Sequence, residues 1–302
     1  MINLVRRIIS GHPEWTSNLN APLSVMKMST PTSGRSLDKG KVLLFVFEPG
    51  LKVPTWCVKT TRSYDEAELI RRNYRNLSLL RAGVDNSALS DLFAKPLFLY
   101  DNKETIFCIE SVCRGQIPSV NQGVLDLVLN AYEDWQVHLL SNSNSNKLWL
   151  VEDLRSLIKD TVSSFNHEDM ETKKIIEYYD TLLKGDNVML PALTQHGDLT
   201  PNNVLLSGDH VSIIDYDFIG ISTLPGYDIF NFILKFHCYD VSFRAICERY
   251  LRRYFEKIGV KIVSLDVLFF AYYILEIKRK DCNIYKKSFE ELIAGFNSLM
   301  IK

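Results

Sequence analysis

The chain reads Gln-His-Gly-Asp-Leu-Thr-Pro-Asn-Asn-Val-Leu-Leu over residues 195–206 and Val-Ser-Ile-Ile-Asp-Tyr-Asp over residues 211–217. The apolar runs at 204–206 and 211–214 are separated by Ser-Gly-Asp-His, a composition typical of a hairpin turn. The polar residues stand where these two runs begin or end. We therefore expect a buried β-hairpin with a cluster of acids and amides at its mouth.

The three polar residues of this hairpin suit different tasks. Asp198 follows an imidazole and a glycine in a loop, where a carboxylate can accept a proton from a hydroxyl. Asn203 offers a neutral oxygen of the kind that Mg²⁺ binds. Asp215 ends an apolar strand, where a buried carboxylate is costly without a cation. Together they predict a metal site that holds nucleotide phosphates.

Length and composition exclude several classes of protein. The 302 residues are 46% hydrophobic, enough for two lobes with packed interiors. With 35 basic and 36 acidic residues the net charge is −1, so no overall field favours nucleic acid or an anionic membrane. The apolar stretch near 267–275 is too short for a membrane span, and Arg6-Arg7 follows the apolar N-terminal residues, unlike a secretory signal. We expect a cytoplasmic protein.

The remaining patterns predict an α+β fold. Strands are expected at 23–28, 41–47, 55–60, 96–100 and 105–112, with one helix over 64–81. Further helices are expected at 124–140, 151–165 and 170–184, from just after Pro225-Gly226 to 235, and at 241–257, 263–280 and 284–300. The hairpin at 204–214 supplies the only strands expected in the second half. The predicted domains are therefore 1–112, a small sheet lobe, and 113–302, a larger helical lobe, with a hinge at about 109–118.

Two further patterns concern ligands. The polar turn at 29–36 contains Ser33 and Gly34, which could line a phosphate, but it lacks the glycines of GxGxxG and the lysine of a Walker A loop, so a plain hairpin is equally open. The six cysteines are scattered without a CxxC pair, which argues against a zinc site and a disulfide framework.

His196-Gly197-Asp198 with Asn203, followed by Ile214-Asp215-Tyr216-Asp217, resembles the signatures of the aminoglycoside phosphotransferase and choline kinase superfamily, which has the protein-kinase-like fold. The order of elements is similar too. A strand with Lys59 comes first, then a helix, a linker at 109–112 and a helical lobe. The resemblance spans most of the chain and implies a two-lobed fold.

The resemblance also implies a role for each site residue. Asp198 would be the catalytic base, and Asn203 and Asp215 would bind Mg²⁺. Lys59 would hold the α- and β-phosphates of ATP or GTP, and the backbone from Glu110 to Val112 would meet the base. Supporting roles fall to His196, which ties down its loop, to Asp217 as a further acid near the metal, and to Asp228 of Pro225-Gly226-Tyr227-Asp228, which supports the loop.

One position departs from the pattern. Asn73-Tyr74-Arg75-Asn76-Leu77 resembles the Glu-Tyr-x-x-Leu of the family, with Asn73 in place of the glutamate that pairs with the strand lysine. Glu66 lies seven residues earlier, on roughly the same helix face. It could take over that pairing if the helix is shifted.

Two functions remain open on these residues. The first is a kinase that transfers phosphate to a hydroxyl of a small molecule, with aminoglycosides, amino-alcohols and sugars all possible acceptors. The second is a catalytically weak, kinase-like nucleotide-binding module with a regulatory role, which Asn73 favours. A protein kinase is disfavoured, because His-Gly-Asp replaces His-Arg-Asp and no activation segment separates Asp215 from Pro225. The oligomeric state is left open.

Overall fold

A computed structural model describes residues 1–16, 22–29, 40–84, 89–119, 121–142, 147–164, 189–237 and 243–260, with isolated positions between 177 and 184 and between 264 and 275. The chain forms two compact units. The first comprises residues 1–116 and 205–217, and the second comprises residues 117–204 and 218–302. The hairpin predicted at 204–214 therefore belongs to the first unit from residue 205 onward.

The first unit is built on a five-stranded antiparallel sheet with strand order β1-β2-β3-β5-β4. The predicted strands are all present. Their bounds are β1 Ser24–Ser29, β2 Lys41–Phe47, β3 Trp56–Thr61, β4 Pro96–Asp101 and β5 Ile106–Ser111, and the hairpin consists of β8 Val204–Ser207 and β9 His210–Ile213.

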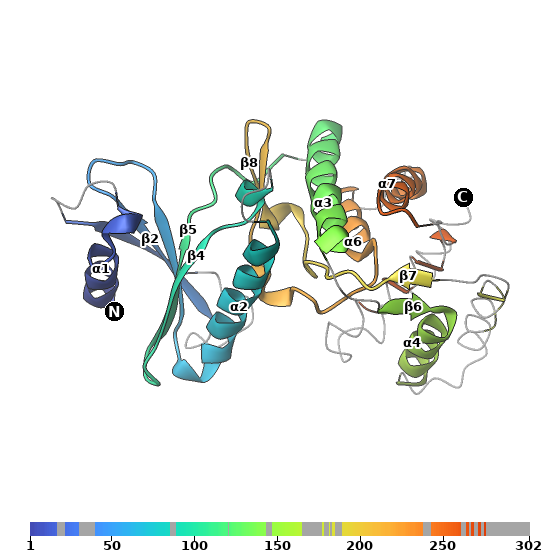
Figure 1. Ribbon diagram of the computed structural model, residues 1–302, viewed down its shortest axis with the longest axis horizontal. Helices are drawn as coiled ribbons and strands as arrows, with labels where there is room; N and C mark the ends of the chain where they lie inside the picture. Colours follow the sequence, from blue (N-terminus) through green and yellow to red (C-terminus); the bar gives the residue numbers. More distant parts are fainter. Residues whose placement is uncertain are drawn as a thin grey trace. The chain divides into compact units, whose positions relative to one another are not determined.

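Each face of the sheet is covered by one helix (Figure 1). Helix α2 (Ala67–Val84), preceded by a 3-10 turn at Tyr64–Glu66, packs Ala67 and Ile70 against Ile106 and Cys108 of β5. Helix α1 (Ile2–Ser10) covers the other face through Val5 and Ile9. The sequence predicted only one helix in this unit. Helix α1 has nine residues and no side-chain cap, so it depends on packing against the sheet rather than on local signals.

The strand register decides which polar side chains meet. Leu43 is opposite Lys59, and Cys57 is opposite Glu110. Since side chains alternate along a strand, Lys41, Lys59 and Glu110 all project from the face that α2 covers. Three charged groups from three strands are thereby collected on one side of the sheet.

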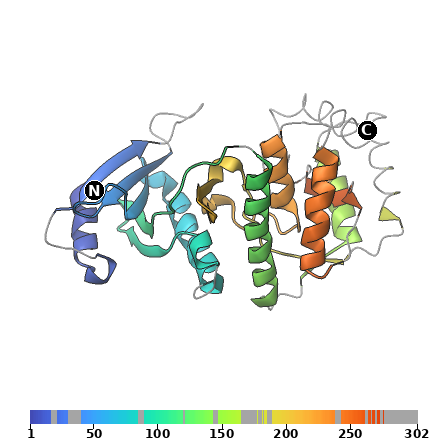
Figure 2. The same cartoon turned by 90° about the horizontal axis from the view of Figure 1, so that it is seen from above.

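The second unit is mainly helical. Helices α3, α6 and α7 pack against one another (Figure 2). Strands β6 and β7 form an antiparallel pair, so the expectation that the hairpin holds the only strands of this half is wrong. With three residues each, they are too short to show an alternating pattern. The bounds are α3 Gln122–Asn142, β6 Leu148–Leu150, α4 Val151–Ser164, β7 Met189–Pro191, α6 Tyr227–His237 and α7 Phe243–Lys257.

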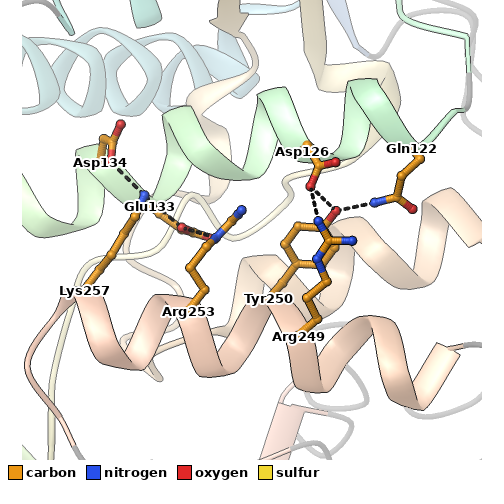
Figure 3. Close-up of polar contacts among 8 residues, drawn as sticks. All are labelled: Gln122, Asp126, Glu133, Asp134, Arg249, Tyr250, Arg253 and Lys257. Carbon is orange, nitrogen blue, oxygen red and sulfur yellow. Dashed lines mark hydrogen bonds and ion pairs between the residues drawn. The ribbon is translucent and has the colours of Figure 1, made fainter.

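Helices α3 and α7 are joined by a row of charged and polar contacts (Figure 3). Glu133 is completely buried and forms ion pairs with two residues of α7. Arg253 Nη2 lies 2.6 Å from Oε1 of Glu133, and Lys257 Nζ lies 3.1 Å from Oε2. About two turns nearer the start of α3, Asp126 accepts a hydrogen bond from the Tyr250 hydroxyl at 2.6 Å. A buried carboxylate with two cations is compensated, so this row fixes how α3 and α7 pack.

Three of the helices predicted for the second half, at 170–184, 263–280 and 284–300, fall largely or wholly outside the described residues. Among the residues that the structure describes, no helix combines the length and the apolar character needed to cross a bilayer.

Candidate functional site

The candidate site residues of the first unit centre on Lys59, whose side chain is about 10% exposed. Its Nζ lies 2.8 Å from Oε1 of Glu110, which is equally buried. Burial alone would lower the pKa of Lys59, but the charge and hydrogen bond of Glu110, together with the neighbouring Cys57 and Cys108, outweigh burial and raise this pKa above its ordinary value. Lys59 is therefore held as a cation inside the sheet–helix interface.

Asn73 of α2 is the second polar neighbour of Lys59. It is fully buried, and its Oδ1 accepts a hydrogen bond from Lys59 Nζ at 3.4 Å, while its Nδ2 donates to Oδ1 of Asp217 at 3.3 Å. Glu66, the candidate replacement for the helix glutamate, instead accepts a hydrogen bond from the backbone N–H of Gly40 at 2.7 Å. The structure thus gives Lys59 a carboxylate partner from β5 rather than from the helix.

Asp215 lies at the end of the hairpin, beside a second lysine. Lys41 Nζ is 3.2 Å from Oδ1 of Asp215 and also contacts Oδ2 of Asp217. The backbone of Asp215 has φ of 66°, in the left-handed region that side chains other than glycine seldom adopt. Backbone strain of this kind is concentrated at functional sites.

Tyr216 connects these groups to the rest of the first unit. Its ring lies under Lys59, with 5.2 Å between Nζ and the ring centroid. Its hydroxyl donates to the carbonyl of Ile213 at 2.6 Å and accepts from the N–H of Ala94 at 3.1 Å, and Asn76 donates to its carbonyl at 2.7 Å. Asp215 and Asp217 therefore flank a residue that is anchored on three sides.

In the second unit, Asp228 holds the loop that carries Asp198. This aspartate is fully buried at the start of α6. Oδ2 accepts from the backbone N–H of His196 at 2.6 Å, and Oδ1 accepts from that of Gly197 at 3.0 Å. The Tyr132 hydroxyl also donates to Oδ2, at 2.5 Å. Burial raises the pKa of Asp228, although the charge of His196 and these donors oppose that rise.

Gly197 is required by the path of this loop. Its φ is 83°, and a Cβ added there would lie 2.3 Å from the carbonyl oxygen of Phe218. No side chain fits in that space without a shift of the backbone. The glycine before Asp198 thus has a steric role, and the carboxylate after it is aimed by a backbone that cannot relax easily.

Asn203 faces Asp198 directly. Its Nδ2 donates to Oδ2 of Asp198 at 3.0 Å and to the backbone carbonyl of the same residue at 2.8 Å. The N–H₂ group is turned toward Asp198, so the amide oxygen points away and remains an acceptor. Asn203 lies in a 3-10 turn, Pro201–Asn203, whose proline fixes the backbone at the first position.

The predicted metal ligands are suited to Mg²⁺ in kind. Asn203 offers an amide oxygen, and Asp215 offers a carboxylate that is 40% exposed. Both are hard oxygen donors. Within the described ranges, no group of three or more His, Cys, Asp or Glu side chains is arranged to hold a metal ion.

The remaining predicted nucleotide contacts are Val112, Ser33 and Gly34. Val112 donates its N–H to the carbonyl of Thr55 at 3.2 Å and lines a cavity of about 550 Å³ in the first unit, whose basic residues are Arg81, Lys95, Arg114 and His210. Ser33 and Gly34 lie outside the described residues.

Sequence reasoning missed Lys41 and the side chain of Glu110. The alternation of β2 was the available signal for Lys41, because Val42, Leu44 and Val46 face α1 and therefore place Lys41 on the opposite face, with Lys59. The pairing of Glu110 with Lys59 depends on the register of β3 and β5, which no local pattern specifies. Tyr132 is fully buried, and its hydroxyl contacts Asp228.

The fold is similar to that of several solved phosphotransferases. Macrolide 2'-phosphotransferase MphH from Brachybacterium faecium matches over 99% of this chain and 97% of its own, with a TM-score of 0.56 and 14% identity. Aminoglycoside phosphotransferase APH(4)-Ia, solved as a thermostable mutant with ADP and hygromycin B, matches over 97% and 95%, with a TM-score of 0.57 and 13% identity.

A third structure, of a putative aminoglycoside phosphotransferase from Ralstonia eutropha, covers 97% of this chain and 94% of its own, with a TM-score of 0.55 and 14% identity. No known family profile and no curated protein matches the sequence. At these identities the likeness concerns the fold. The chain therefore has a two-lobed, protein-kinase-like fold similar to that of these phosphotransferases, as its sequence motifs predicted.

Proposed function

We propose that the protein is a small-molecule kinase that transfers the γ-phosphate of ATP or GTP to a hydroxyl group, in the presence of Mg²⁺. The observation that carries the proposal is the arrangement of the loop at 196–203. There, Asp198 is aimed by Asn203 at 3.0 Å and its loop is held by the buried Asp228. Such fixed positioning is what phosphoryl transfer requires of a protein.

In this proposal each residue has a distinct task. Asp198 orients the acceptor hydroxyl and takes its proton, as the new P–O bond forms and the bond from the γ-phosphate to the departing nucleoside diphosphate breaks. Lys59 neutralises charge on the α- and β-phosphates. Asn203 and Asp215 would hold Mg²⁺, which would supply positive charge to stabilise the transferred phosphate. Asp217 stays near the metal ligand through Lys41 and Asn73.

A phosphate-transfer screen tests this function. The purified protein is incubated with Mg²⁺ and labelled ATP or GTP, with panels of aminoglycosides, macrolides, amino-alcohols and sugars as acceptors. Phosphorylated product with at least one acceptor is expected, at a rate above that of the Asp198→Asn variant. Absence of transfer to every acceptor, despite tight binding of the metal–nucleotide complex, would contradict the enzyme function.

A kinase-like regulatory module is the second candidate. Two observations favour it: a neutral Asn73 occupies the helix position of the expected acid, and Lys41 already contacts the proposed metal ligand Asp215. Such a module would bind nucleotide in the same place without turnover. Thermal stabilisation by nucleotide with and without Mg²⁺, measured beside the transfer screen, separates the two functions.

A further inference from the structure

We propose that Glu110 on strand β5 is the residue that positions Lys59 for nucleotide phosphates, in place of an acid on helix α2. The proposal rests on the proposed function, because it takes Lys59 as a phosphate ligand. Among the described residues, Glu110 supplies the carboxylate contact of Lys59, with 2.8 Å between Oε1 and Nζ. It is therefore a positioning residue, acting through Lys59.

The sheet itself makes this contact. Cys57 pairs with Glu110 and Lys59 pairs with Cys108, so Glu110 is the diagonal neighbour of Lys59 on the same face of adjacent strands. Diagonal neighbours lie within reach of long side chains. In protein kinases the corresponding lysine pairs with a helix acid, so that movement of the helix controls activity. A partner on β5 keeps Lys59 in place wherever α2 lies.

Asn73 has a neutral side chain that can both accept and donate hydrogen bonds, which suits a position between Lys59 and Asp217. Its amide oxygen accepts from Lys59 while its N–H₂ group donates to Asp217. A carboxylate at this position would lie about where Nδ2 now contacts Asp217 at 3.3 Å, and two negative charges would face each other. With Glu110 supplying the negative charge, a neutral amide can connect Lys59 to the acid beside the proposed metal ligand.

Glu110 and Lys59 also depend on each other energetically. Oε2 of Glu110 is buried and has no hydrogen-bond partner within the described part of the chain. The charge of Lys59 is therefore the main compensation for burying this carboxylate. Removal of one member of such a pair leaves an uncompensated buried charge, which shifts the ionisation of the other.

The first test measures Lys59 in the protein without nucleotide. Side-chain NMR of labelled lysine, with the signal assigned by Lys59→Arg, follows its titration in the wild type and in Glu110→Gln. In the wild type the signal should stay that of a charged amine through the range where exposed lysines titrate. In Glu110→Gln, the carboxylate no longer offsets the effect of burial, and titration should move to lower pH. Glu104→Gln removes an exposed acid from the turn between β4 and β5, and Lys59 should titrate in this variant as it does in the wild type.

The second test measures nucleotide affinity at neutral pH. Glu110→Gln should weaken binding of the Mg²⁺–nucleotide complex by roughly tenfold or more, the equivalent of one charged contact. Glu110→Asp, which keeps the charge on a shorter side chain, should fall between Glu110→Gln and the wild type. Asn73→Glu should weaken binding, because the new carboxylate faces Asp217. If Glu110→Gln does not fold, the aspartate variant and Asn73→Glu still decide the question.

Two results would overturn the proposal. One is an unchanged titration of Lys59 in a folded Glu110→Gln protein. The other is tighter nucleotide binding by Asn73→Glu, which would mean that the helix position still needs an acid. Failure of the proposed function would be seen separately, as a wild-type protein that phosphorylates no acceptor. Even then, the NMR titration of Lys59 would still show whether Glu110 keeps Lys59 charged.

Discussion

The Nζ atom of Lys41 lies 3.2 Å from Oδ1 of Asp215, the proposed metal ligand. A divalent cation that binds Asp215 must therefore do so beside a fixed positive charge. Like charges at this separation repel, and partial exposure of the carboxylate screens the repulsion without removing it.

Lys41→Met should consequently bind Mn²⁺ more tightly than the wild type when no nucleotide is present. We expect a gain of about tenfold, measured by paramagnetic resonance or calorimetry. Lys27→Met, which removes an exposed lysine from the neighbouring strand β1, provides the matched control and should have little effect. Weaker Mn²⁺ binding by Lys41→Met would show that Lys41 helps to build the cation site rather than opposing it.

Asp198→Asn should remove phosphate transfer while nucleotide binding stays nearly intact. The amide keeps the size of the side chain but cannot take a proton, and loss of a general base costs roughly a hundred- to ten-thousand-fold in rate. Single-turnover transfer and equilibrium nucleotide binding are measured on the same preparation. Thr200→Ala, in the same loop, should retain activity. Substantial transfer by Asp198→Asn would refute the assignment of the base.

Asp228→Ala should destabilise the second unit strongly. The substitution leaves the backbone N–H groups of His196 and Gly197 without their buried acceptor, at a cost of about 3–5 kcal/mol in the free energy of unfolding. Tyr132→Phe removes a single hydroxyl from the same acceptor and should cost only about 1 kcal/mol. Chemical denaturation compares the two, and equal losses would mean that the loop is held by other contacts.

Gly197→Ala should disturb the Asp198 loop more than an equivalent change in the hairpin turn. At Gly197 a methyl group meets the carbonyl of Phe218 at 2.3 Å, whereas at Gly208 nothing lies within 4 Å, although both have positive φ. Gly208→Ala should cost only the left-handed backbone penalty, about 1 kcal/mol. Thermal unfolding and phosphate transfer are measured for both, and a Gly197→Ala protein as stable and active as Gly208→Ala would contradict the steric role.

The sequence predicts the sheet well because its strands alternate or run apolar between turns. Strand β2, with Val42, Leu44 and Val46 on one face, is the clearest case. It also places Asp228 correctly at a helix start, where an aspartate normally caps. The contacts of Asp228 with His196 and Gly197 cross 32 and 31 residues of chain, so the local pattern predicts the residue but not its hydrogen bonds.

The partner of Lys59 illustrates what the sequence leaves open. A helix acid is the natural expectation, and Glu66 lies in the 3-10 turn that immediately precedes α2. The choice of Glu110 follows from the register between β3 and β5, which tertiary packing determines, and Glu66 is already engaged by Gly40. Helix α1 is similar, since nine residues without a cap form a helix only because a sheet face is there to be covered.

The left-handed backbone of Asp215 implies that selection for stability and selection for activity favour different residues at this position. Asp215→Ala and Asp215→Gly both delete the carboxylate, but only glycine adopts φ of 66° without strain, so the glycine variant should unfold with a free energy about 1 kcal/mol higher than that of the alanine variant. A library of variants at position 215 sorted for resistance to proteolysis alone should therefore enrich glycine over alanine. Sorting for retained phosphate transfer should return aspartate, the residue that the backbone tolerates less well.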